Sequence, residues 1–220
     1  MKYSKIACYG AFARKPKIPF TPPAVEGHPQ CFYMKGTNGS GKSTIASEMR
    51  ARDPDAYYVV VMGRKLLTVF PNFNTLAVGK YDNSNSKGCD SLKDTEEMLW
   101  AVTVSEESEF AGMHMIFDGI IPASILATWV ERLRERDREL VVAFLSTPFE
   151  TCLERIRARN KGKVLDDHLV SLVKRKYDRI VGFRSRHADL FPDVKACIID
   201  GQATIEHMLV SFLNRKMESL

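Results

Sequence analysis

Residues 36–44, "GTNGSGKST", constrain the fold of this chain more than any other segment. They fit the pattern G-x-x-x-x-G-K-[ST] and lie between an apolar run, "CFYM", and a segment of helical character, "STIASEMRA". Glycines let successive backbone N–H groups converge on phosphate oxygens, and the helix that follows adds its free N–H groups and the positive end of its dipole. A strand, this loop and a helix in that order predict a binding loop for a nucleoside triphosphate.

The polar residues of the loop each have a chemical role in this interpretation. Lys42 is placed to neutralise the β- and γ-phosphates of ATP, and Ser43 to ligate Mg²⁺. The motif does not distinguish ATP from other triphosphates, and a glycine-rich turn without a ligand is the alternative. We expect nucleotide contacts from the whole segment: Gly36, Thr37, Asn38, Gly39, Ser40, Gly41, Lys42, Ser43 and Thr44.

A second motif, "MIFDG", lies downstream of the loop and contains a carboxylate. Here an apolar strand ends in Asp118, as in a Walker B site. Carboxylate oxygens suit Mg²⁺, so we expect Asp118 at the metal, directly or through water. The alternative is that Asp118 only caps the next helix.

Apolar runs and helical patterns alternate along the chain. Strands are predicted at 56–63, 113–119, 140–147 and 196–200, with one short strand (75–81) in an otherwise irregular insert at 64–95. Helices are predicted at about 95–110, from Pro122, after a capping box at Thr147, over 167–187 and around 205–213. The alternation predicts an α/β fold with a parallel sheet flanked by helices. We expect an extended, proline-rich leader at 1–30 and one domain at 31–220.

The charge is unevenly distributed along the chain, whose net charge is +5. Residues 1–30 have a net charge of +4, and residues 159–187 carry nine Lys or Arg and three Asp, a net of +6. These segments favour contact with a polyanion, or else form a phosphate-handling lid and a solvated tail. No apolar run is long enough to cross a bilayer, and five cysteines without a C-x-x-C pair indicate reduced thiols in the cytoplasm.

Over residues 31–215 the order of these features resembles the P-loop nucleotide and small-molecule kinases. The loop, the Asp-terminated strand, the next strand and "CLERIRARNKGK" carry the resemblance. It implies a three-layer P-loop kinase fold with an arginine-bearing lid at about 155–167. Arg155 and Arg159 would share a helical face and stabilise charge on the transferred phosphoryl group. A solvated basic helix is the alternative.

The insert "VGKYDNSNSKGCDSLKDTEE" resembles a segment of phage-encoded P-loop kinases that phosphorylate 5-hydroxymethyluracil within DNA. "GKYD" and "GCD" carry this resemblance, which implies a DNA substrate with a modified base in the host cytoplasm. It also implies Asp82 or Asp90 as general base, against an Asx turn and an ordinary loop carboxylate. Phe70, Phe73 and Tyr81 would stack on an extruded base, or belong to the core.

Three functions are therefore open at this point. The leading one is an ATP-dependent kinase that phosphorylates the hydroxymethyl group in DNA. The second is a kinase for a free nucleoside, nucleotide or small metabolite. The third, of another class, is a nucleotide-gated DNA-binding ATPase. The sequence predicts no particular oligomeric state.

Overall fold

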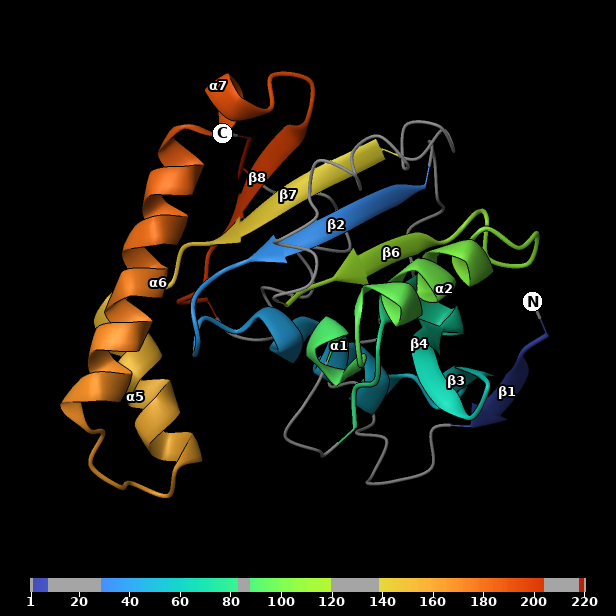
Figure 1. The fold of residues 1–220 in the computed structure, drawn as a ribbon, viewed down its shortest axis with the longest axis horizontal. Coiled ribbons are helices and arrows are strands. Elements are labelled where there is room, and N and C mark those ends of the chain that lie inside the picture. The colour runs from blue at the N-terminus through green and yellow to red at the C-terminus, as the bar shows by residue number, and fades with distance from the viewer. Residues whose placement is uncertain (1, 8–28, 83–87, 120–138, 204–217, 220) are drawn as a thin grey trace. The chain divides into compact units, whose positions relative to one another are not determined.

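The structure is a computed structural model that describes residues 2–7, 29–82, 88–119, 139–203 and 218–219 (Figure 1). The chain divides into two compact units. The first unit contains Met1–Tyr33 and Ser43–Val141, and the second contains Met34–Lys42 and Val142–Leu220. The chain therefore passes from one unit to the other inside the phosphate-loop motif, between Lys42 and Ser43. The helices predicted from Pro122 and around 205–213, and most of the leader, lie outside the described residues.

The first unit is a sheet with helices and two short 3₁₀ turns. Its strands follow the order β1-β3-β4-β5-β6-β2. These strands are β1 (Ser4–Ala7), β2 (Gln30–Lys35, up to Tyr33), β3 (Tyr57–Val61), β4 (Arg64–Phe70), β5 (Thr75–Val78) and β6 (His114–Phe117). The remaining elements are α1 (Lys42–Arg52), η1 (Pro71–Phe73), η2 (Cys89–Ser91) and α2 (Thr95–Ser105).

The sheet of the first unit is mixed, so the prediction of a parallel sheet is wrong for this half of the chain. β2 and β5 pair parallel to β6. The pairs β1–β3, β3–β4 and β4–β5 are antiparallel. Only Met62 and Gly63 join β3 to β4, and both have positive φ, at 49° and 78°. A two-residue connection makes a hairpin, whereas parallel strands need a crossover of about a dozen residues. The insert, predicted to be irregular, thus contributes a full strand, β4.

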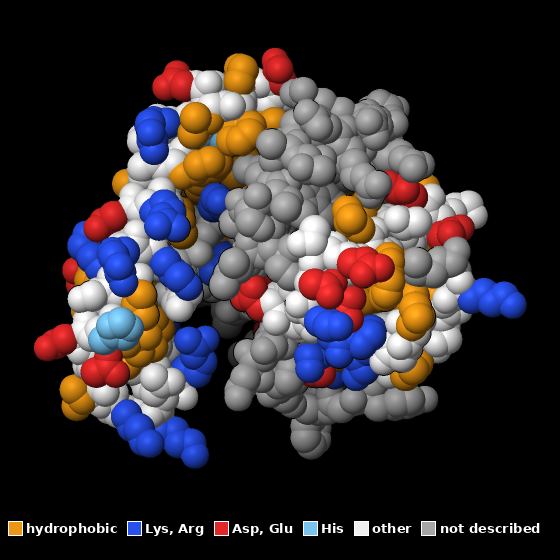
Figure 2. All heavy atoms as spheres, in the orientation of Figure 1, with side chains coloured by type: hydrophobic (Ala, Val, Ile, Leu, Met, Phe, Trp, Pro, Cys, Tyr) orange, Lys and Arg blue, Asp and Glu red, His pale blue; other side chains and the backbone are white. Residues whose placement is uncertain are grey.

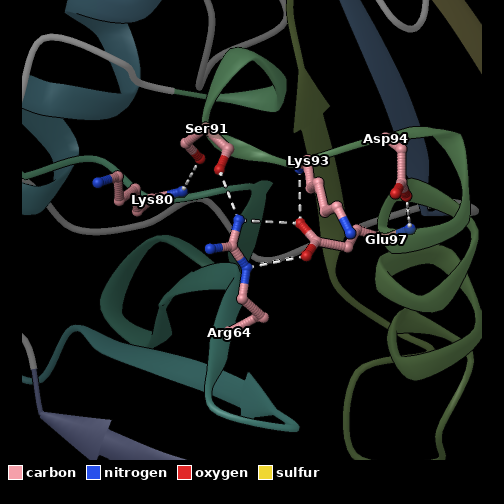
Figure 3. A network of polar contacts seen from close by, with 6 residues as sticks. All are labelled: Arg64, Lys80, Ser91, Lys93, Asp94 and Glu97. Atoms are coloured by element: carbon pink, nitrogen blue, oxygen red, sulfur yellow. Dashed lines mark hydrogen bonds and ion pairs between the residues drawn. The ribbon is translucent and has the colours of Figure 1, made fainter.

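A polar network fixes the segment that leads into α2 (Figure 3). Glu97, in the first turn of α2, is only 5% exposed and accepts hydrogen bonds from Arg64 Nε at 2.8 Å and Nη2 at 3.2 Å. The Lys93 backbone N–H donates to the same carboxylate at 2.7 Å, and Asp94 caps the helix by accepting from the Glu97 N–H. A buried carboxylate is tolerated only when it is paired in this way. The network joins the start of β4 to the start of α2.

The chain closes on itself on either side of residues 83–87. The Lys80 N–H donates to Ser91 Oγ at 3.0 Å, and Ser91 Oγ donates to the Gly88 carbonyl at 2.7 Å. Gly79 has a φ of 87°, and a Cβ there would lie 2.0 Å from the Gly88 carbonyl oxygen. Glycine is therefore required at this crossing, which holds η2 in a fixed position.

The second unit contains a helical pair and short strands. Its strands follow the order β7-β8-β9, and in Figure 1 helix α6 runs alongside α5. The elements are β7 (Glu139–Leu145, from Val142), α5 (Phe149–Arg159), α6 (Asp167–Ser185), α7 (His187–Leu190), β8 (Lys195–Ile199) and β9 (Glu218–Ser219). The core of the helical pair consists of four buried residues, Leu153, Ile156, Leu165 and Val173.

The start of α5 was predicted correctly, but its cap was not. The N-cap residue is Pro148, and no side chain caps the helix. The hydroxyl of Thr147, predicted to be that cap, instead donates to the Ser40 carbonyl of the phosphate loop at 2.8 Å. Thr147 is buried, so its hydroxyl needs an internal acceptor, and the loop supplies one.

The described part of the chain contains neither a membrane-spanning helix nor a disulfide bond. None of its helices is both long and apolar enough to cross a lipid bilayer. Its four cysteines, Cys31, Cys89, Cys152 and Cys197, are buried and form no disulfide bond with one another.

Replacing Glu97 with alanine should lower the free energy of unfolding by about 2 kcal/mol, because the Lys93 N–H and the Arg64 guanidinium lose their acceptor. The matched control is Glu96→Ala, which removes an exposed carboxylate from the same helical turn and should cost less than about 0.5 kcal/mol. Urea denaturation of both variants measures the difference. Equal destabilisation would show that the network contributes nothing specific.

Candidate active site

The centre of the site in the first unit is Asp118, which directly follows β6. Its Oδ2 accepts a hydrogen bond from Ser43 Oγ at 2.9 Å, and its Oδ1 accepts one from the Tyr81 hydroxyl at 2.9 Å. Asp118 is 3% exposed and Tyr81 is 1% exposed. A carboxylate in such surroundings stays charged only if its oxygens find donors, and these two side chains provide them.

Burial also strengthens the preference of the donor for its protonated form. It raises the pKa of the Tyr81 phenol well above its ordinary value, and the charge of Asp118 raises it further. Burial followed by the Asp118 charge likewise raises the pKa of the Cys89 thiol. Both groups therefore stay protonated at neutral pH, and Tyr81 remains a permanent hydrogen-bond donor to Asp118.

Two glycines let the backbone approach this carboxylate. Gly88 has a φ of 62°, and a Cβ there would lie 1.9 Å from Asp118 Oδ1. Gly119 has a φ of 119°, and a Cβ there would lie 2.6 Å from Asp90 Oδ1. The Cys89 N–H also donates to the Asp118 carbonyl at 3.2 Å. The segment Gly88–Asp90 therefore places Asp90 next to Gly119, the residue that follows Asp118.

The phosphate loop, residues 36–42, belongs to the second unit. Gly39 and Gly41 have φ values of 81° and 102°, which side chains rarely adopt. A Cβ on Gly39 would lie 2.4 Å from the Cys152 carbonyl oxygen, and one on Gly36 would lie 2.3 Å from Ser40 Oγ. The glycines of the motif are thus required by close packing as well as by backbone conformation.

The Ser40 carbonyl is held from two sides. Besides the Thr147 hydroxyl, Arg155 donates to it through Nη1 at 3.4 Å. The other terminal nitrogen of Arg155, Nη2, donates to the Gly201 carbonyl at 2.8 Å. Arg155 therefore ties the phosphate loop to the segment after β8.

Helix α6 supports the start of the same loop. Thr37 Oγ1 donates to the Val173 carbonyl at 3.2 Å, and Lys176 Nζ donates to Asn38 Oδ1 at 3.5 Å. Both contacts join residues that are more than a hundred positions apart in the chain. The shape of the loop thus depends on α5 and α6 as well as on its own sequence.

The loop has donors suited to an anion. Lys42 Nζ donates to the carbonyls of Gly36 at 2.7 Å and Thr37 at 3.0 Å, so its charge lies over the loop. Helix α1 begins at Lys42, and the first N–H groups of a helix have no acceptor within it. Among the described residues, Ser40 Oγ is buried without a hydrogen-bond partner. These groups fit the phosphates of a nucleotide.

The first unit offers part of a magnesium site. The Ser43 hydroxyl and the Asp118 carboxylate are hard oxygen ligands of the kind that Mg²⁺ prefers. The described residues contain no group of three or more His, Cys, Asp or Glu that would hold a metal alone. Mg²⁺ usually keeps several waters and binds through one or two protein oxygens and substrate phosphates, so this pair fits it.

The other predicted site residues have different surroundings. Arg155 is half-buried against the loop, whereas Arg159 is exposed at the end of α5. Thr44 is half-buried on α1, behind Ser43. Asp90 is exposed in η2, beside Gly119, and Asp82 is half-buried just before residues 83–87. The catalytic roles of these residues stay predictions.

The aromatic residues of the insert belong to the core. Phe70, Phe73 and Tyr81 are 0%, 7% and 1% exposed, so the alternative that they stack on an extruded base is wrong. Sequence reasoning missed the contact of Tyr81 with Asp118 and the close approach of Gly88. "GKYD" and "GCD" draw attention to both positions, but neither motif shows that they meet at the end of β6.

The family model and the sequence relatives that match this chain all carry the same description. A family model described as 5-hmdU DNA kinase matches residues 12–210. The chain is 45% identical over 204 residues to 5-hmdU DNA kinase 1 of Salmonella phage ViI, covering 90% of this chain and 91% of that protein. It is 28% identical over 184 residues to the 5-hmdU DNA kinase of Pseudomonas phage M6, covering 80% and 97%. A protein of the same name from Bacillus phage SP10 is 35% identical over 136 residues, only 21% of its length.

Solved structures give a weaker likeness. A deoxyadenosine kinase from M. mycoides with bound dATP matches with a TM-score of 0.40 and 13% identity, covering 85% of this chain and 99% of that one.

The approach of Gly88 to Asp118 yields a prediction. Gly88→Ala should displace the Asp118 carboxylate, because the new methyl group would overlap Oδ1. We expect binding of the magnesium complex of a non-hydrolysable ATP analogue to weaken by about tenfold or more, as measured by calorimetry.

The matched control is Gly112→Ala. Gly112 has no atom within 4 Å of an added Cβ, so this variant should bind like wild type. Unchanged binding in Gly88→Ala, with the fold intact by circular dichroism, would show that the position of Asp118 does not depend on this contact.

Proposed function

Because the chain belongs to the 5-hmdU DNA kinase family, we propose that it transfers the γ-phosphate of ATP to the 5-hydroxymethyl group of hydroxymethyluracil in DNA. It is a P-loop phosphotransferase. The family match supports the choice of acceptor, and the structural observation that supports phosphoryl transfer is the Ser43–Asp118 hydrogen bond, because it joins the hydroxyl of the phosphate-loop motif to the carboxylate at the end of β6. The named relatives are phage proteins, so we place the reaction in the host cytoplasm.

Binding of the triphosphate is assigned to the loop and the start of α1. Backbone N–H groups between Gly36 and Thr44 would hold the phosphate oxygens, and Lys42 would turn from the loop carbonyls towards them. Ser43 and Asp118 would hold Mg²⁺, which neutralises phosphate charge. Tyr81 would keep the Asp118 carboxylate oriented.

The transfer itself needs a base and charge stabilisation. The oxygen of the hydroxymethyl group forms a bond to the γ-phosphorus, the bond from that phosphorus to the bridging oxygen breaks, and ADP leaves. The acceptor proton passes to a carboxylate, for which we propose Asp90, because its Oδ1 lies beside Gly119, next to Asp118. Arg155, which already contacts the loop, and Arg159 would stabilise charge on the moving phosphoryl group.

Acceptor choice is tested with radiolabelled ATP and four acceptors: hydroxymethyluracil DNA, matched thymine DNA, the free nucleoside and its monophosphate. We expect label on the hydroxymethyluracil DNA alone. Lys42→Ala should lower that transfer by at least about a hundredfold, while retention of DNA at low salt persists.

Two results would contradict the proposal. Label on the free nucleoside or monophosphate but not on DNA would identify a small-molecule kinase. ATP hydrolysis without any labelled acceptor, together with release of DNA on ATP addition, would identify a nucleotide-gated DNA-binding ATPase.

The assignment of the base is tested by Asp90→Asn, which keeps the shape of the side chain but removes its basicity. We expect kcat on hydroxymethyluracil DNA to fall by about 10² to 10⁴, with little change in the KM for ATP. Asp82→Asn is the matched control, with the same chemical change at the other carboxylate of the insert. A large loss of kcat in Asp82→Asn alone would reassign the base to Asp82.

A further inference from the structure

One face of α6 carries a row of arginines. Arg175 and Arg179 are one helical turn apart, and Arg186 follows directly after the helix. At about 100° per residue the three positions fall within roughly 40° of one another around the helix axis. All three are exposed, whereas Val173, on the opposite face, is fully buried. Figure 2 shows Lys and Arg side chains gathered over this part of the second unit.

The acidic residues at the start of α6 do not balance this charge. Asp166 is the N-cap residue, and its carboxylate accepts from the Leu169 N–H at 2.7 Å. Asp167 lies in the first helical turn, where a negative charge interacts favourably with the helix dipole. Both carboxylates thus have a role in the helix itself.

The remaining acidic residue of the helix pairs with a lysine. Asp178 Oδ1 accepts from Lys174 Nζ at 2.5 Å, four residues away. In the described part of the chain, Arg175 and Arg179 form no ion pair, and Arg186 Nε donates only to the Gly182 carbonyl at 3.1 Å. The guanidinium groups of the arginine row therefore form no ion pair among the described residues and are exposed for an external anion.

The same helix is anchored firmly to the phosphate loop. Its Val173 carbonyl accepts from Thr37, and Phe183 packs against Phe144 of β7 with ring centroids 5.8 Å apart. The helix that presents the arginine row is thus held by tertiary contacts, so its backbone need not become ordered when the row binds a ligand. A ligand on this face would be held by a helix that also shapes the nucleotide loop.

We propose that Arg175, Arg179 and Arg186 bind the sugar–phosphate backbone of the DNA substrate outside the reacting nucleotide. The inference rests on the proposed function for its choice of polyanion. The row extends over about 16 Å, and one DNA strand carries a phosphate about every 3.4 Å along its axis, so several phosphates lie within its reach. One guanidinium group can donate to two oxygens of the same phosphate. Such contacts position DNA without reading its sequence.

The test compares Arg175→Ala/Arg179→Ala with the control Lys65→Ala/Lys93→Ala. The control removes the same net charge from two exposed lysines of the first unit. Binding is measured by fluorescence anisotropy on a long duplex without hydroxymethyl groups, between about 50 and 200 mM salt. Phosphorylation is measured on long hydroxymethyluracil DNA and on a hydroxymethyluracil trinucleotide.

We expect the arginine variant to bind the duplex about tenfold more weakly at low salt, with the slope of log K against log salt reduced by about two. Its KM for long DNA should rise by a similar factor while kcat and activity on the trinucleotide stay unchanged. The control should match wild type, and Arg175→Lys/Arg179→Lys should recover most of the slope, because it keeps the charge.

Three outcomes would overturn the inference: an unchanged slope in the arginine variant, an equal loss in the control, or an equal loss of activity on long DNA and trinucleotide. Failure of the proposed function gives a different result. In that case the wild-type protein would still bind the duplex with a steep dependence on salt, and the arginine variant would bind it more weakly. Neither long hydroxymethyluracil DNA nor the trinucleotide would be phosphorylated.

Discussion

The position of one buried carboxylate, Asp118, determines most of the site in the first unit. Taking a charge out of water is costly, and Ser43 and Tyr81 offset part of that cost for Asp118 by donating to its two oxygens. Tyr81 is protonated at neutral pH even at its ordinary pKa, and burial raises that pKa further. The same requirement for close contact excludes a side chain at Gly88. The fold itself therefore orients the carboxylate.

The phosphate loop depends on a second set of contacts. Its Ser40 carbonyl is held by Thr147 and Arg155, and its start is held by α6 through Thr37. A glycine-rich loop has many accessible backbone conformations, and these contacts select one of them. The helices of the second unit therefore order the loop, and one of them, α6, also presents the arginine row. Nucleotide binding and the proposed DNA contact would thus depend on the same rigid helix.

The resemblance to 5-hydroxymethyluracil DNA kinases, which depended on "GKYD" and "GCD", is confirmed by the family match and by the 45% identity to a phage relative. The α/β class is also confirmed, since strands and helices both make up large parts of the described chain. The parallel sheet was wrong in the first unit because Met62 occupies a positive-φ position where Asn or Gly is usual, so the two-residue hairpin left no signal. The cap at Thr147 was wrong because a buried hydroxyl found a distant acceptor.

The sequence by itself determined the features that depend on neighbouring residues. The glycine spacing, Lys42 and Ser43 define a phosphate loop, and an apolar strand ending in an acid defines Asp118. Only the tertiary structure decided which distant groups meet: Tyr81 with Asp118, Asp90 with Gly119, and Thr147 with Ser40. The physical reason is the distance along the chain over which each kind of interaction acts. Backbone preferences act over a few residues and are visible in the sequence, whereas the partners of a buried polar group are set by packing between segments tens of residues apart.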